Sequence, residues 1–123
     1  MRRATVFSTA LLLSSLVAGS VFAGGEVKQG VYIVQGTNFD GSAYSGSAKI
    51  SISSETTCRI VWHTGGTDSS GICMRDEDSF AAAYKLGNSV GLMIYKIKDD
   101  GSLEGVWTIA DKSGSGTETL TPK

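Results

Sequence analysis

The sequence predicts an all-β protein built as a small eight-stranded antiparallel meander, which closes or partly closes into a barrel. The first observation is alternation: between Tyr44 and Ser53, apolar or small residues alternate with serines and a lysine. A period of two over this length is typical of a half-buried strand. The second observation is a series of glycine-containing turn signals at short intervals, namely Asp40-Gly41, Gly65-Gly66, Gly87-Asn88 and Asp100-Gly101.

Three longer turns are predicted at Ser54–Thr56, Asp76–Asp78 and Lys112–Gly114. Together with the four glycine-containing turns, they divide the chain into eight predicted strands. Every connection is too short to be a crossover, so consecutive strands should pair antiparallel. An open meander leaves two exposed edges, and closure into an up-and-down barrel removes both; a flattened, partly open barrel or sandwich is the alternative. An eight-stranded interior is either filled by side chains or holds one small ligand. The predicted strands are 30–37, 43–53, 57–64, 69–75, 79–86, 89–98, 102–110 and 115–121.

The start of the chain has the order of a signal peptide. Arg2 and Arg3 precede an apolar stretch from Leu11 to Phe22, and small residues stand before a cut after Ala23. The stretch is too short to span a bilayer as a helix. We therefore expect residues 1–23 to be removed and residues 24–123 to form one domain that is periplasmic or secreted.

Charge and hydropathy limit the partners of this domain. The whole chain has a formal net charge of −1, and loss of the two signal arginines makes the mature part more acidic. Such a domain lacks the basic footprint of a nucleic-acid-binding protein or of a protein that binds anionic membranes. No second apolar run is long enough for a membrane-spanning helix. We expect a protein or small-molecule partner.

Cys58 and Cys73 are the two cysteines of the chain. In an exported protein such a pair predicts a disulfide. If Gly65-Gly66 forms a two-residue turn, Thr64 pairs with Thr67 and the cysteines lie directly opposite each other. A longer loop, from Gly65 to Ser70, would shift this register.

The sequence offers few residues for catalysis or for metal binding. Nucleophilic catalysis needs a serine or cysteine beside an oriented base, and His63 is the single histidine. A zinc site uses about four histidine, cysteine or carboxylate ligands, or three and a water. One histidine and a disulfide-bonded cysteine pair do not supply the usual set, and no cofactor is expected. A hydrolase that uses His63 stays a third interpretation, behind two non-catalytic ones.

Carboxylates gather at one predicted end of the barrel, because alternate turns of a meander emerge at the same end. Clustered oxygen ligands can bind calcium, although the spaced calcium-loop motif is missing. Solvated turn residues that favour solubility explain the same pattern. The carboxylates considered as metal ligands are Asp76, Asp78, Asp99 and Asp100.

Aromatic residues are spread over six predicted strands, where they either fill the interior or line a small pocket. With a two-residue Asp100-Gly101 turn, Trp107 lies opposite Ile94 and shares a face with Leu92. In the ligand-binding interpretation, Asn38 or Asn88 adds a polar anchor. The residues predicted to bind a ligand are Tyr44, Trp62, His63, Tyr95 and Trp107.

A family resemblance is carried by the segments Gly30–Ser42, Tyr44–Gly46, Trp62, Gly71-Ile72, Tyr95, Asp100–Trp107 and Gly116–Pro122. These segments resemble a family of small exported bacterial β-proteins of mostly unknown function, some of which are labelled fibronectin-binding. The resemblance covers essentially the whole mature chain and implies no activity. A fainter similarity to avidin-like and other calycin-like barrels lies in the Gly-x-Tyr/Trp strands and is an analogy of architecture.

Because the sequence shows no recognisable set of catalytic residues, a binding module is the favoured interpretation. Such a module would recognise a protein or a small molecule in the periplasm or outside the cell. The alternative is a non-catalytic structural or stability factor of the cell envelope, with no small ligand and a filled interior.

Overall fold

The computed structural model describes residues 25–123, and the predicted signal peptide lies outside the described residues. The described part contains eight strands in chain order. Their bounds are β1 (Gly30–Thr37), β2 (Ala43–Ile52), β3 (Cys58–Thr64), β4 (Thr67–Asp76), β5 (Ser79–Leu86), β6 (Ser89–Ile97), β7 (Leu103–Ile109) and β8 (Gly116–Pro122).

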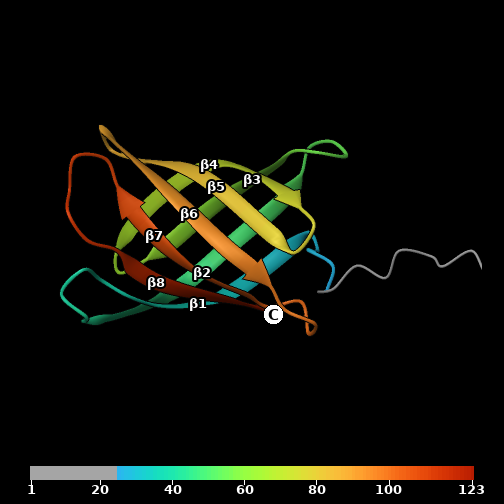
Figure 1. Cartoon of the computed structure of the whole chain (residues 1–123), viewed down its shortest axis with the longest axis horizontal. Coiled ribbons are helices and arrows are strands. Elements are labelled where there is room, and N and C mark those ends of the chain that lie inside the picture. Colours follow the sequence, from blue (N-terminus) through green and yellow to red (C-terminus); the bar gives the residue numbers. More distant parts are fainter. Residues whose placement is uncertain (1–24) are drawn as a thin grey trace, which may run out of the picture.

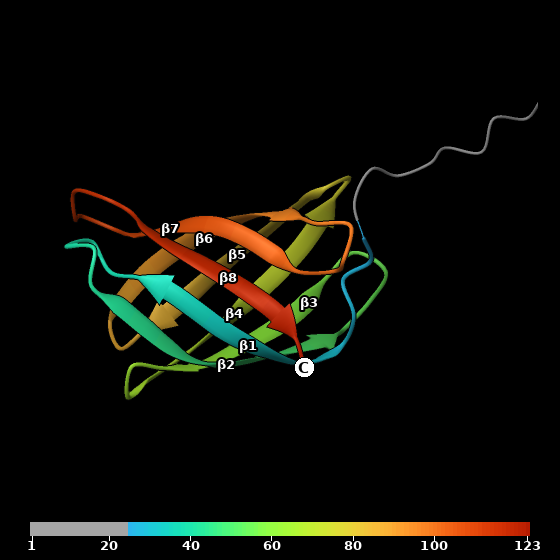
Figure 2. The ribbon, with the colours of Figure 1, turned by 90° about the horizontal axis from the view of Figure 1, so that it is seen from below.

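Each strand pairs antiparallel with the next, and β1 pairs with both β2 and β8. The sheet is therefore a closed barrel in the order β1 to β8 (Figures 1 and 2). Closure leaves no strand with unpaired backbone groups along a free edge. The predicted eight-stranded antiparallel meander is confirmed, and its closed form is the correct one of the two alternatives.

The connections divide between the two ends of the barrel. The β1–β2, β3–β4, β5–β6 and β7–β8 connections lie at one end, on the left in Figure 1, which we call the open end. The β2–β3, β4–β5 and β6–β7 connections lie at the other end, which we call the acidic end. Glu55, Asp76–Asp78 and Asp99-Asp100 belong to this acidic end, as the meander predicts.

The β3–β4 hairpin confirms the short turn. Gly65 and Gly66 both have positive φ, +57° and +76°, as a two-residue turn of the primed type requires. Thr64 pairs with Thr67, and Cys58 lies directly opposite Cys73. The two cysteines form a disulfide, with their Cα atoms 4.9 Å apart, and both are buried inside the barrel.

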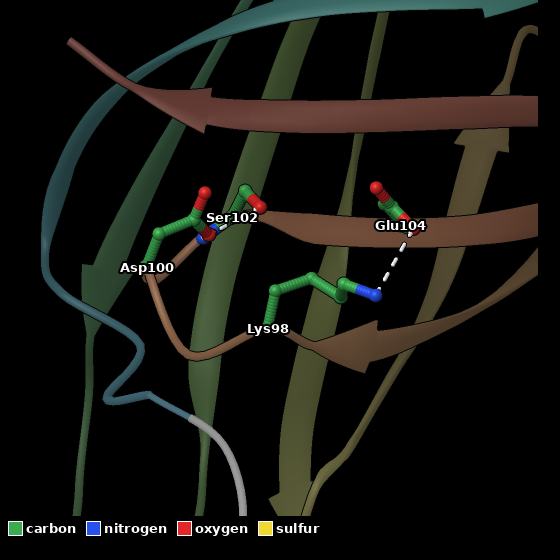
Figure 3. Close-up of polar contacts among 4 residues, drawn as sticks. All are labelled: Lys98, Asp100, Ser102 and Glu104. Carbon is green, nitrogen blue, oxygen red and sulfur yellow. Dashed lines mark hydrogen bonds and ion pairs between the residues drawn. The ribbon is translucent and has the colours of Figure 1, made fainter.

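The β6–β7 turn differs from the prediction. Ile97 pairs with Leu103, so the connection is one residue longer than a two-residue Asp-Gly turn allows. Gly101 takes φ +83°, and the Asp100 carboxylate accepts hydrogen bonds from the backbone N–H and the hydroxyl of Ser102 (Figure 3). Beside this turn, the Nζ atom of Lys98, which follows β6, lies 3.6 Å from the carboxylate Oε2 of Glu104 on β7.

This extra residue changes the partner of Trp107. Trp107 pairs with Met93, not with Ile94, and both Trp107 and Met93 face the interior. Leu92 and Ile94 instead point outward and are more than half exposed. The predicted Trp107–Ile94 pairing is therefore wrong, because a one-residue slip reverses the face of every side chain in the pairing strand.

The acidic half of the interior is filled by large apolar side chains. Alternate residues of each strand point inward, as the period of two predicts. The largest side chains that are almost fully buried are Tyr32, Tyr95, Phe80, Ile50, Ile60, Ile97, Leu103, Leu120 and Val34.

The interior near the open end is less completely filled because β4 contributes small residues there. Ser69 pairs with the inward-facing Trp62, and the next inward position of β4 is Gly71. At Gly71 the backbone of β5 lies so close that a Cβ would be 1.9 Å from the carbonyl oxygen of Ala83. The space beside Trp62 is therefore bordered by the small side chain of Ser69, whereas Gly71 permits the close approach of β4 and β5.

The outer surface of the sheet carries apolar side chains among polar ones. Within residues 25–123, no helix is long and apolar enough to cross a membrane. The large exposed apolar residues are Val31, Ile33, Ile52, Val61, Ile72, Met74, Val90, Leu92, Ile94 and Val106.

Candidate ligand-binding cavity

A cavity of about 200 Å³ lies inside the barrel at its open end. Four aromatic rings from four different strands line it: Tyr44 of β2, Trp62 of β3, Tyr84 of β5 and Trp107 of β7. An engineered apolar cavity of roughly 150 Å³ holds benzene, so this space suits a single ring with a short substituent. Its other lining residues include Asn38, Thr64, Thr67, Ser69, Leu86, Met93 and Ile109.

Glu118 of β8 is the charged residue of this cavity. Its side chain is only 4% exposed, because Glu118 shares the inward face of β8 with Gly116 and Leu120. Buried carboxylates are rare unless they are paired or hydrogen-bonded. Among residues 25–123, the ion pairs are His63–Asp68 and Lys98–Glu104, so no described cation neutralises Glu118.

Three side chains donate hydrogen bonds to Glu118. The indole N–H of Trp62 donates to Oε1 at 2.9 Å, and the Tyr95 hydroxyl donates to the same oxygen at 2.7 Å. The Tyr44 hydroxyl donates to Oε2 at 2.5 Å. A carboxylate offers about four acceptor positions, so Oε2 keeps one acceptor position that these donors do not use.

Burial raises the pKa of Glu118 above its ordinary value, and the three hydrogen bonds from Tyr44, Tyr95 and Trp62 partly oppose this shift. The same burial and the Glu118 charge raise the pKa of Tyr84 to about 12. They also raise the pKa of Tyr44 and of Tyr95. The tyrosines therefore remain protonated donors around the carboxyl group at neutral pH.

The raised pKa of Glu118 predicts a pH-dependent stability. The folded state holds the proton to a higher pH than the unfolded chain, whose carboxyl group titrates near 4.5. The free energy of unfolding should therefore fall as pH rises from 4.5 through the folded pKa. Urea unfolding between pH 4.5 and 7.5 should show this fall in the wild type and a smaller one in Glu118→Gln.

Two acidic residues outside the cavity act in a different pH range. Hydrogen bonds from Ser42 lower the pKa of Asp40, and those from Ser102 lower the pKa of Asp100. Their contribution is lost only as pH falls below about 3.8, so it does not overlap the range above 4.5 in which wild type and Glu118→Gln are compared. An identical pH dependence in wild type and Glu118→Gln would contradict the assignment.

The aromatic rings pack against one another around the cavity. Trp62 and Tyr84 meet edge to face, with centroids 5.5 Å apart, and Tyr44 meets Trp107 in the same way at 6.2 Å. Phe39 of the β1–β2 loop stacks on Trp107 at 4.8 Å. These contacts hold the rings in fixed orientations, which reduces the entropy lost on binding.

Trp107 also lies against the backbone of β8. A Cβ at Gly116 would be 2.4 Å from the indole nitrogen of Trp107, so only glycine permits this approach. Within the described residues, that nitrogen is buried without a hydrogen-bond partner. An unpaired buried donor is destabilising, and functional sites are one place where such a cost is found.

The structure brings together four of the five residues predicted to bind a ligand. Tyr44, Trp62 and Trp107 line the cavity. Tyr95 reaches the cavity through its hydrogen bond to Glu118. His63 lies apart from them, on the outer face of β3.

His63 alternates with the inward-facing Trp62, and its side chain is 60% exposed. Its ring nitrogen Nδ1 lies 2.6 Å from a carboxylate oxygen of Asp68, which pairs with it across the β3–β4 hairpin. Of the two proposed polar anchors, Asn38 lines the cavity and Asn88 is not among its lining residues.

Glu118 is the functional candidate that the sequence analysis missed. The inward face of β8 was nevertheless readable from the sequence, because Gly116, Glu118 and Leu120 alternate with threonines. Since the large apolar Leu120 marks the inward face, Glu118 must share it. A charged residue in phase with a core leucine was the available signal.

The acidic end does not form a metal site in the described residues. No group of three or more histidine, cysteine, aspartate or glutamate side chains within residues 25–123 is arranged to hold a metal ion. Asp100 is instead engaged by Ser102. Of the other carboxylates considered for calcium, Asp78 and Asp99 lie in turns, and Asp76 is the last residue of β4.

Comparisons with known proteins identify β-barrels. No family model matches the chain, and no curated protein is significantly similar to it in sequence. A redesigned β-barrel superposes with a TM-score of 0.67 at 20% identity, over 77% of this chain and 90% of the other. A second redesigned barrel, mFAP1 bound to DFHBI, gives 0.65 at 21% identity over 76% and 93% of the two chains. A mutant of the fluorescent protein UnaG gives 0.50 at 11% identity over 77% and 95%.

These similarities establish the class of fold, a closed antiparallel β-barrel. At such low identity they carry no activity over to this chain. The resemblance to small exported bacterial β-proteins and their fibronectin-binding label is not supported by a family match and stays a prediction.

Proposed function

We propose that this chain is a non-catalytic binding module that holds a small molecule in the cavity at the open end of its barrel. The observation that carries the proposal is Glu118, a buried carboxylate that lines an incompletely filled interior. A pocket with aromatic walls and a few convergent polar groups is the usual form of a small-molecule site. The mFAP1 barrel, which is similar in fold, is itself bound to a small molecule, DFHBI.

We further propose that the module works in the periplasm or outside the cell, after cleavage behind Ala23. The signal-peptide order of residues 1–23 supports this location, and so does the disulfide between Cys58 and Cys73. Disulfides persist in oxidising compartments and are rare in the cytosol.

A thermal-shift screen with single-ring compounds tests the proposed binding function. A ligand at a hundred times its dissociation constant should add about 2.7 kcal/mol to the free energy of unfolding. That corresponds to a rise of roughly ten degrees or more in Tm for a domain of this size. Calcium should give no comparable shift.

A matched pair of variants locates the site. Ser69 lines the cavity, whereas its neighbour Ser70 is exposed on the outer face of β4. Ser69→Leu should fill the cavity and abolish the ligand-induced shift, and Ser70→Leu should leave it unchanged. The alternative, a structural or stability factor of the cell envelope, predicts no shift with any compound. If no compound raises the Tm, the small-molecule proposal is overturned and a protein partner is favoured.

A further inference from the structure

The charge that lines the cavity is negative, without a neighbouring positive charge among the described residues. Within residues 25–123, Glu118 is the only lining residue that carries a formal charge at neutral pH when ionised, and no described lysine or arginine lines the space. A ligand that brought a second negative charge would meet Glu118 at short range in a poorly solvated interior. Like charges in such surroundings repel strongly. Anionic ligands are therefore disfavoured.

Glu118 can accept a further hydrogen bond from a ligand. All three of its described contacts come from N–H or O–H donors, and the indole N–H of Trp62 can only donate. Its Oε2 receives a single hydrogen bond, from Tyr44. The remaining acceptor position therefore suits a donor on the ligand, and a charged donor forms the stronger hydrogen bond.

The aromatic walls favour the same kind of ligand. The faces of indole and phenol rings carry partial negative charge and attract cations, most strongly where water is excluded. Tyr44, Trp62, Tyr84 and Trp107 present such rings around the cavity from four strands. A carboxylate surrounded by aromatic rings offers an organic ammonium both a counter-charge and cation–π contacts.

We infer that the ligand is a small organic cation with an apolar body, a primary or secondary ammonium whose N–H group donates to Glu118. This inference rests on the proposed function and names the ligand class of the same site. The volume of about 200 Å³ limits the body to one ring with a short arm. Calcium is disfavoured, because it needs six to eight oxygen ligands and Glu118 is the only carboxylate among the described lining residues.

Three probes of nearly equal shape test the ligand class on the disulfide-bonded chain. They are 2-phenylethylamine, 2-phenylethanol and 3-phenylpropanoate, which at pH 7 are a cation, a neutral donor and an anion. Isothermal titration calorimetry should give the ammonium at least tenfold tighter binding than the alcohol, and the anion weaker binding than either. In Glu118→Gln, the preference for the ammonium over the alcohol should fall to within about threefold.

The control variant is Glu104→Gln, which removes a carboxylate from the exposed outer face of β7. It should keep the full preference for the ammonium, since Glu104 lies outside the cavity. The comparison of the three probes on the wild type does not depend on any variant folding.

Three outcomes overturn the inference, and one of them also overturns the proposed function. If the alcohol binds as tightly as the ammonium, the cavity is a binding site but not a cation site. If the ammonium preference survives in Glu118→Gln, Glu118 does not supply it. If none of the three probes binds at millimolar concentration, both the ligand class and the small-molecule function fail.

Discussion

Replacement of Glu118 by leucine should lower the free energy of unfolding by about 2–4 kcal/mol. The change leaves the indole N–H of Trp62 without its buried acceptor, and it leaves the hydroxyl of Tyr95 with only the weak acceptor Sδ of Met93, 3.1 Å away. Each unpaired buried donor costs roughly 1–3 kcal/mol, and relief of the carboxylate's own burial offsets part of the sum. Urea unfolding at pH 7 measures the difference, which corresponds to roughly ten to twenty degrees in Tm.

Two further variants make this result specific. Glu118→Gln keeps an acceptor for the donors and should lose less stability than Glu118→Leu. Glu104→Leu removes only an exposed ion pair with Lys98 on the outer face and should have an effect within about 1 kcal/mol. A Glu118→Leu variant as stable as the wild type would contradict the claim that Trp62 and Tyr95 depend on this carboxylate.

Removal of the disulfide should have an effect of similar size. The Cys58–Cys73 bridge spans a sequence separation of 15 residues, for which the chain-entropy model gives about 3 kcal/mol. Both cysteines are buried, so the double variant Cys58→Ala/Cys73→Ala also loses packing inside the barrel. Denaturant unfolding should move to a clearly lower midpoint, with a somewhat steeper slope because the denatured chain without the bridge exposes more surface.

Reduction of the wild type gives an independent check on this prediction. Dithiothreitol should destabilise the wild type and leave the double variant unaffected, because the described residues contain no other cysteine. Equal unfolding midpoints for the oxidised wild type and the double variant would show that the bridge does not stabilise the barrel.

The strand pattern of this barrel was predictable because its signals are local. Alternation places residues of one face together, and two glycines at Gly65-Gly66 permit only a short list of turns. That turn fixes the register of β3 against β4, and the register places Cys58 opposite Cys73. For these elements the sequence contains the information in adjacent residues.

The β6–β7 turn was mispredicted because its signal is compatible with two geometries. Asp100-Gly101 fits a two-residue turn and also a three-residue turn with glycine in the left-handed region. The hydrogen bonds from Ser102 to Asp100 accompany the three-residue form found in the structure. The one-residue difference decides whether Met93 or Ile94 stands beside Trp107.

The candidate site was only partly predictable because it depends on contacts between distant strands. The aromatic residues stood out as large side chains, but nothing local in the sequence says that Trp62, Tyr95 and Tyr44 converge on one carboxylate. Glu118 is 74 residues away from Tyr44 in sequence, and closure of the barrel brings the two together. His63 is the opposite case. Its imidazole suggested a binding role, but its position in the alternation of β3 places the side chain on the outer face of the barrel.

The central claim is that a ligand enters the barrel at its open end, and tryptophan indole resonances test it most directly. The chain has two tryptophans, Trp62 and Trp107, and both line the cavity. In a ¹⁵N-labelled sample titrated with 2-phenylethylamine, both indole N–H signals should shift progressively and reach saturation with one ligand bound per chain. Backbone amides of the outward-facing Ile72 and Leu92 should move much less. Unchanged indole signals, with shifts confined to the outer face, would contradict a binding site inside the barrel.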